Sequence, residues 1–151
     1  MRVLLFVVLL LGFSNNLAAQ SGSYSVTFDH VALSVSDVDR SAAFYSEVLN
    51  LEEITNKTQM NGIRWFSLGE GKELHLISLL KDDVKLNKAV HFALTVSDFS
   101  SFVDKLKLRG IDYSDWRGTV GQINVRADGI KQVFFQDPDG YWIEMNSVGQ
   151  K

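Results

Sequence analysis

The sequence predicts an α+β fold built from two tandem βαβββ modules. The first observation is an internal repeat: residues 29–37 (DHVALSVSD) match residues 90–98 (VHFALTVSD), 61 positions further on. The second is that each copy continues with helical spacing and then with short alternating apolar segments between turn signals. The chain has 151 residues, of which 46% are hydrophobic. This composition provides enough apolar material for one shared core.

The first module is predicted over residues 28–80. Alternating apolar and β-branched residues predict its first strand, and Ser36-Asp37 provides an N-cap for the helix that follows. The helix has apolar residues at helical spacing, and the segments after it are separated by Gly-containing turns. The predicted elements are a strand at 28–35, a helix at 38–51 and strands at 52–58, 63–68 and 73–80.

The second module is predicted over residues 89–148, after a polar linker at 81–88. Ser97-Asp98 caps its helix, and Gly110 ends it because glycine tolerates the left-handed C-cap conformation. The sole proline, Pro138, lies in a tight Asp-Pro-Asp-Gly turn between the last two strands. The predicted elements are a strand at 89–96, a helix to about 109, a strand at 111–116, a loop at 117–129 and strands at 130–136 and 141–147.

The N-terminus predicts a secretory signal peptide over residues 1–19 and a lead-in over residues 20–27. Arg2 precedes an unbroken apolar run from Val3 to Leu11, and small residues follow before a cleavage site after Ala19 or Gln20. The run is too short for a transmembrane helix. We therefore expect an exported protein, periplasmic or secreted, with no membrane span after the signal is removed.

Charge and cysteine content narrow the possible functions. The formal net charge is −3 and no cluster of basic residues occurs, so nucleic acid is not an expected partner. The chain has no cysteine, which excludes disulfides, thiolate ligands and a cysteine nucleophile. A small-molecule ligand is the expected partner.

The three histidines all take part in the repeat. His30 and His91 are equivalent by the 61-residue offset, and His75 pairs with Glu144 when residues 71–76 are aligned with residues 140–145. On a strand, residues two apart share a face, so small neighbours leave room in front of His30 and His91. A carboxylate within an apolar strand is costly unless it is paired or bound to metal. The pattern predicts one divalent metal bound by His30, His75, His91 and Glu144, with Glu73 as a substitute ligand.

Several other side chains are candidates for substrate binding. A cation near the predicted site could bind an anionic substrate, although a solvated surface charge is the simpler interpretation. The tryptophans could line a pocket, but aromatic strand residues more often belong to the core. The cationic candidates are Arg64, Arg126 and Lys131, with Arg117 in the long loop, and the aromatic ones are Trp65, Trp116 and Trp142.

The chain resembles the vicinal-oxygen-chelate superfamily of glyoxalases, bleomycin-resistance proteins and extradiol dioxygenases. The resemblance covers about residues 26–148 and is carried by DHVALSV at 29–35, SAAFYSEVLNL at 41–51, HFALTV at 91–96 and FQDPDGYWIE at 135–144. It implies paired βαβββ modules that form a cupped mixed β-sheet around a single metal (Zn, Ni, Mn or Fe). The implied ligands are His30, His75, His91 and Glu144, and Glu144 would also transfer a proton. Small members often share the site between two chains, which implies a homodimer.

Differences from the glyoxalase I pattern leave the reaction open. His75 stands where that family usually has Glu, Ser34 where it tends to have Arg, and Leu79 where Asn is expected. A glutathione-derived substrate is therefore disfavoured. The resemblance implies a metal-dependent lyase or isomerase that acts on a small oxygenated substrate. The alternatives are a metal-free ligand-sequestering protein of the bleomycin-resistance type and an Fe(II) dioxygenase-like enzyme.

Overall fold

The computed structural model describes residues 25–79 and 84–149. The predicted signal peptide, residues 20–24 of the lead-in and residues 80–83 at the module boundary lie outside this part of the chain. None of the helices in the described residues is long and apolar enough to cross a membrane. The α+β class and the two βαβββ modules are confirmed, with one mixed sheet in each module.

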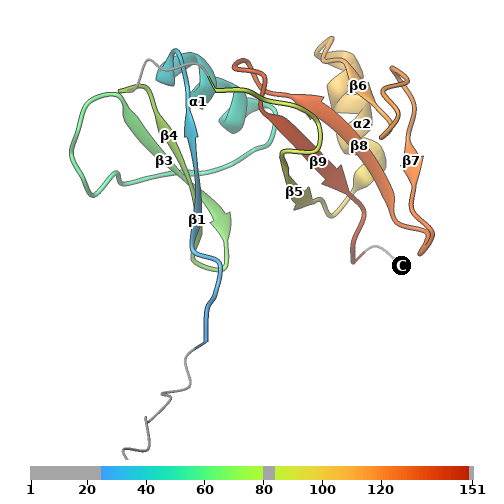
Figure 1. The fold of residues 1–151 in the computed structure, drawn as a ribbon, viewed down its shortest axis with the longest axis horizontal. Coiled ribbons are helices and arrows are strands. Elements are labelled where there is room, and N and C mark those ends of the chain that lie inside the picture. The colour runs from blue at the N-terminus through green and yellow to red at the C-terminus, as the bar shows by residue number, and fades with distance from the viewer. Residues whose placement is uncertain (1–24, 80–83, 150–151) are drawn as a thin grey trace, which may run out of the picture.

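The first module forms the left-hand sheet in Figure 1, with strand order β1-β4-β3-β2. β1 and β4 run parallel, and the other pairs are antiparallel. Residues 25–29, directly before β1, extend away from the body of the molecule (Figure 1). The elements are β1 (His30–Ser34), α1 (Val38–Glu47), β2 (Glu53–Ile54), β3 (Ile63–Gly69) and β4 (Lys72–Ile77).

The second module forms the right-hand sheet in Figure 1, with strand order β5-β9-β8-β6 and β7 paired to β8. Its β5–β9 pair is parallel, as β1–β4 is in the first module. A short strand lies inside the predicted loop 117–129, which corrects that part of the prediction. The elements are β5 (His91–Thr95), α2 (Phe99–Leu108), β6 (Tyr113–Ser114), β7 (Asn124–Val125), β8 (Lys131–Gln136) and β9 (Trp142–Asn146).

The helix boundaries follow their capping residues. The Asp37 side chain accepts hydrogen bonds from the first turn of α1, and Asp98 does the same for α2, as the sequence predicted. Helix α2 is followed by Gly110 with a positive φ of 65°, also as predicted. Helix α1 ends at Glu47, earlier than residue 51. The reason is that Asn50 takes a left-handed conformation with φ of 55°, which an α-helix cannot continue through.

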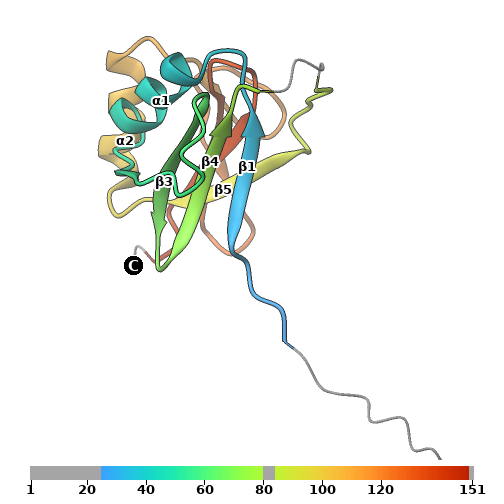
Figure 2. The same cartoon turned by 90° about the vertical axis from the view of Figure 1, so that its left-hand side faces the viewer.

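Both sheets turn an apolar face toward one shared core. Leu74 and Phe66 of the first sheet belong to the same buried cluster as Phe135 and Ile143 of the second. Both helices pack on this core: Phe44 of α1 and Phe102 of α2 both contact the Phe135 ring. Figure 2 shows the two helices on the same side of the molecule. Because side chains alternate along a strand, the opposite face of each sheet points away from this core.

The turn between β8 and β9 joins the modules. One Asp139 carboxylate oxygen accepts hydrogen bonds from the Ser36 main-chain N–H at 2.8 Å, the Ser36 hydroxyl at 2.6 Å and Arg40 at 3.1 Å. The other accepts from the Ser41 hydroxyl at 2.6 Å. Burial acts against the charge of Asp139, but these hydrogen bonds and the positive Arg40 outweigh it and hold its pKa below the ordinary value.

A second contact of this turn is more deeply buried. The Tyr45 hydroxyl donates to Asp137 at 2.8 Å, and both side chains belong to the buried part of the molecule. Burial raises the pKa of Asp137, and burial together with the neighbouring Asp137 raises the pKa of Tyr45. Tyr141 adds a third link, since its hydroxyl donates to the Ser34 carbonyl at 2.9 Å. The two modules are therefore joined by polar contacts as well as by the apolar core.

Candidate metal and substrate site

The four predicted metal ligands lie on the outward faces of the two sheets, in two pairs. His30 on β1 and His75 on β4 belong to neighbouring parallel strands, and their rings stack with centroids 4.3 Å apart. His91 on β5 and Glu144 on β9 are neighbours in the other sheet, with Nε2 and Oε2 3.4 Å apart. We call these pairs the first and second half-sites.

The first half-site is open and flanked by carboxylates. His30 has a 42% exposed side chain, and its Nδ1 lies 2.7 Å from Asp29. The Nε2 of His75 lies 2.8 Å from Glu73. Trp65 of β3 stacks on the other face of the His75 ring at 4.1 Å, so three aromatic rings lie in a row. The hydrogen bond from His30 lowers the pKa of Asp29. Each imidazole keeps one ring nitrogen for a further ligand.

The second half-site is more buried, and hydrogen bonds with neighbouring groups orient both of its side chains. The Nδ1 of His91 lies 2.8 Å from the Lys88 carbonyl, which can only accept, so Nδ1 carries the proton. Glu144 is buried, and its Oε1 accepts a hydrogen bond from Asn146 at 2.9 Å. This leaves the His91 Nε2 and the Glu144 Oε2 facing each other. A neutral imidazole offers a lone pair at Nε2, so this pair calls for a proton or a metal cation between the two atoms.

The donor chemistry fits a divalent metal. Three imidazoles and a carboxylate suit zinc, nickel, manganese or iron, and the partners behind His30, His91 and Glu144 are those that orient metal ligands in proteins. Within residues 25–79 and 84–149, however, no group of three or more such side chains lies together so that it could hold a metal ion. The structure therefore brings the predicted ligands together two by two, and the four-ligand site stays a prediction.

The predicted substrate cations lie elsewhere. Arg64 shares the helix-covered side of β3 with Phe66 and is bound by Glu53 and, at 2.8 Å, by Asp39. Arg126 pairs with Asp128 at 2.7 Å in the turn after β7. Lys131 is exposed at the start of β8, and its Cα faces Val125. None of these three contacts a half-site residue through an ion pair in the described part of the chain. Arg117 is exposed in the loop after β6.

Two further residues lie beside the half-sites. Trp65 was a candidate for lining a pocket, with the core as the preferred interpretation, and it stacks on His75 because Trp65 and His75 are directly paired in the antiparallel sheet. Lys88 was assigned to the linker, yet its carbonyl orients His91 and its ammonium lies 4.6 Å from the Trp142 ring. No sequence pattern singles out Lys88. Only its position three residues before a predicted ligand could have drawn attention to it.

The comparisons with known proteins define the family. The model of the Glyoxalase/Bleomycin resistance protein/Dioxygenase superfamily matches residues 27–145. The chain therefore belongs to this superfamily, as its sequence motifs indicated. Members of the superfamily typically use a divalent metal and act on small molecules.

Individual relatives span most of the chain. It is 30% identical over 125 residues to Glyoxylase I 4 of Arabidopsis thaliana, covering 79% of this chain and 69% of the relative. It is 29% identical over 128 residues to Metallothiol transferase FosB of Lysinibacillus sphaericus, covering 80% and 82%. The crystal structure of lactoylglutathione lyase from Agrobacterium tumefaciens superposes with a TM-score of 0.62 at 18% identity, covering 83% of this chain and 96% of that one. This structural likeness concerns the fold.

Proposed function

We propose that this protein is an exported, divalent-metal-dependent enzyme of the glyoxalase type, a lyase or isomerase acting on a small oxygenated substrate. The observation that carries the proposal is the second half-site, where the Nε2 of His91 and the Oε2 of the buried Glu144 lie 3.4 Å apart while the other ring nitrogen of His91 is held by the Lys88 carbonyl. The reaction class follows the glyoxalase members of the superfamily. Export rests on the signal-peptide pattern of residues 1–19.

The two half-sites point away from a shared core, so one chain does not close a four-ligand site in this arrangement. We propose a homodimer in which His30 and His75 of one chain meet His91 and Glu144 of a second. Two-fold symmetry then forms two equivalent sites, one for each chain. Each site would contain one open half-site and one buried half-site.

The roles of the residues follow from their surroundings. His30, His75 and His91 would hold the metal, each with one ring nitrogen engaged by Asp29, Glu73 or the Lys88 carbonyl. Glu144 would also hold it through Oε2, and on release from the metal that oxygen would be free to take a proton from the substrate, while Asn146 fixes Oε1. The bound metal would polarise the substrate oxygens and stabilise the negative charge that develops on them.

Titration of the purified, chelator-treated protein with Co²⁺ tests the proposal. We expect one saturable site per chain with a visible absorption band. Glu144→Gln keeps the shape of the side chain but removes its charge, so it should weaken binding by more than about tenfold. Glu47→Gln is the matched control, because Glu47 lies on the exposed side of α1 and pairs with Arg109. Unchanged binding in Glu144→Gln would contradict the proposal.

Metal binding also tests the two alternative functions, a metal-free sequestering protein and an Fe(II) dioxygenase-like enzyme. If the protein binds no Co²⁺, Zn²⁺, Ni²⁺ or Mn²⁺ saturably, the metal-free sequestering protein becomes the better interpretation. Elemental analysis of protein purified without oxygen addresses the other alternative. Stoichiometric iron, with O₂ consumption by the isolated protein, would replace the lyase or isomerase reaction with a dioxygenase reaction.

A further inference from the structure

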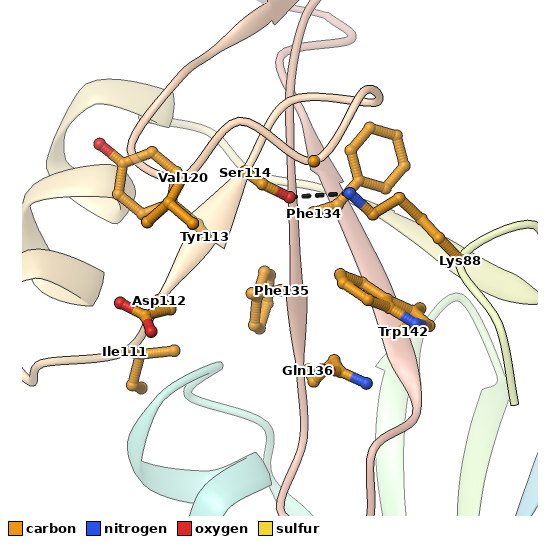
Figure 3. A pocket seen from close by; sticks show the side chains of 11 residues that line it. Lys88, Ile111, Asp112, Tyr113, Ser114, Val120, Phe134, Phe135, Gln136 and Trp142 are labelled. Atoms are coloured by element: carbon orange, nitrogen blue, oxygen red, sulfur yellow. Dashed lines mark hydrogen bonds between the residues drawn. The ribbon is translucent and has the colours of Figure 1, made fainter.

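A pocket of about 290 Å³ lies beside the second half-site (Figure 3). The ring of Phe134, which lines this pocket, makes an edge contact with the His91 ring at 5.5 Å. Its walls come from β6, β8 and β9 and from the loop near Gly118. Phe134 and Trp142 provide aromatic surface, while Lys88 and Ser114 meet across its upper part. This volume is at the lower end of the range for ligand pockets, about 300–1,000 Å³, so it suits a small molecule.

The Lys88 ammonium has an incomplete set of partners. It donates to the Ser114 hydroxyl at 2.8 Å and to the Asp115 carbonyl at 2.9 Å. It lies 4.6 Å from the centre of the Trp142 ring and 5.6 Å from that of Phe134. An ammonium has three donors, and these contacts use two of them. Among the described residues, no carboxylate forms an ion pair with Lys88, so the half-buried positive charge lacks a counter-ion.

The position of Lys88 links the pocket to the proposed chemistry. Its main-chain carbonyl holds the His91 imidazole at 2.8 Å, while its side chain reaches over the neighbouring rings. Among the described residues that line the pocket, Asp112 is the only one with a carboxylate, and it lies on the opposite side from Lys88 (Figure 3). Asp112 is exposed, so water screens its charge. The electrostatic preference of the pocket near Lys88 is therefore for an anion.

We infer that this pocket binds the acid group of the substrate, and that the substrate is a small, flat carboxylate. Lys88 Nζ and the Ser114 hydroxyl hydrogen-bond the carboxylate, and the rings of Phe134 and Trp142 contact the flat part of the molecule. This inference rests on the proposed function, since it takes the half-sites as the place of reaction. It gives Lys88 a specificity role separate from metal binding.

Binding of benzoate and benzamide to the purified, metal-free protein in the presence of chelator tests the inference. The two probes share a ring, and only benzoate carries the charge. By calorimetry, with tryptophan fluorescence as a second signal from Trp142, benzoate should bind at least about tenfold more tightly than benzamide. Lys88→Met should bring benzoate down to the affinity of benzamide and leave benzamide unchanged, whereas Lys88→Arg keeps the charge and most of the preference.

Lys107→Met is the matched control, because Lys107 lies on the exposed side of α2 and pairs with Asp104. Equal affinities for benzoate and benzamide, no benzoate binding, or an equal loss in Lys107→Met would overturn the inference. The first two results need no variant, so they decide even if Lys88→Met does not fold. Since no metal is present in this assay, its failure is distinguishable from failure of the Co²⁺ titration.

Discussion

The two modules share one plan but hold their ligands differently. Both place a parallel strand pair at the half-site, β1–β4 in the first module and β5–β9 in the second. The first half-site has two stacked imidazoles backed by exposed or part-exposed carboxylates. In the second, a buried carboxylate and an imidazole are fixed by Asn146 and by a main-chain carbonyl. The second half-site is therefore the more preorganised of the two, and the first is the more exposed.

The chain segments beside the two half-sites also differ, in length. Eight residues, 55–62, separate β2 from β3 in the first module, whereas 16 residues separate the equivalent strands β6 and β8 and include β7. This longer segment helps to form the pocket next to Phe134. The two copies thus place their predicted ligands at matching strand positions, and the longer connection of the second copy lines a pocket beside its half-site.

The largest expected effect is the loss of Co²⁺ affinity when one predicted ligand is removed, and this loss should differ between the two half-sites. His91→Ala should weaken Co²⁺ binding by more than about a hundredfold, because it removes a ligand from the preorganised pair. His30→Ala should cost less, since the His30 side chain is 42% exposed and must be ordered when metal binds. Both are measured by calorimetric titration. A larger loss in His30→Ala would reverse the comparison.

The connection between the modules should be the next most sensitive feature. Asp139→Asn removes the charge that Ser36, Ser41 and Arg40 stabilise, and should lower the free energy of unfolding by about 2–3 kcal/mol at pH 7. Denaturant unfolding measures this change. Asp104→Asn, at an exposed i,i+3 pair with Lys107, should have almost no effect.

The fall in the free energy of unfolding caused by Asp139→Asn should become smaller as the pH falls. Because the folded-state pKa of Asp139 lies below its ordinary value of 3.8, the ionised carboxylate stabilises the fold above that value. The contribution is lost as the pH falls through the lowered folded-state pKa. The difference between wild type and Asp139→Asn should therefore be constant near neutrality and shrink in acid. A difference that grows below pH 3.8 would contradict the role of the charge.

The smallest expected effects come from residues that only orient a ligand. Asn146→Ala frees the Glu144 carboxylate and should weaken Co²⁺ binding roughly ten- to hundredfold. Asp29→Asn is its counterpart in the first half-site and should cost less than about tenfold, because Asp29 is exposed and its charge is screened. Equal losses in the two variants would mean that the half-sites are equally preorganised.

The sequence predicted the module plan and the equivalent strand positions of the candidate ligands. Because the 61-residue repeat preserves register, His30 and His91 had to occupy equivalent strand positions, and the structure pairs them with His75 and Glu144 respectively. The repeat does not predict that each pair of side chains points away from the shared core. That direction depends on which face of each sheet joins the shared core, and this is decided by packing between modules.

The candidate substrate residues illustrate the limits of sequence position. Arg64 is adjacent in sequence to Trp65, which stacks on His75, but alternation places Arg64 on the opposite side of β3, where Glu53 and Asp39 bind it. Lys88 belongs to a polar run that looks like a solvated linker. Its role depends on β6, β8 and β9 converging around it, which the local sequence does not encode.

Mixing two variants, each altered at one predicted metal ligand, tests the central claim that a metal site is shared between the half-sites of two chains. His75→Ala and Glu144→Gln are each expected to bind Co²⁺ weakly, and they are unfolded together and refolded as a mixture. A dimer with shared sites should regain about a quarter of the wild-type sites, because half of the dimers are mixed and one of their two sites has all its ligands. Strong binding that stays absent in a refolded mixture of confirmed dimers would contradict the account.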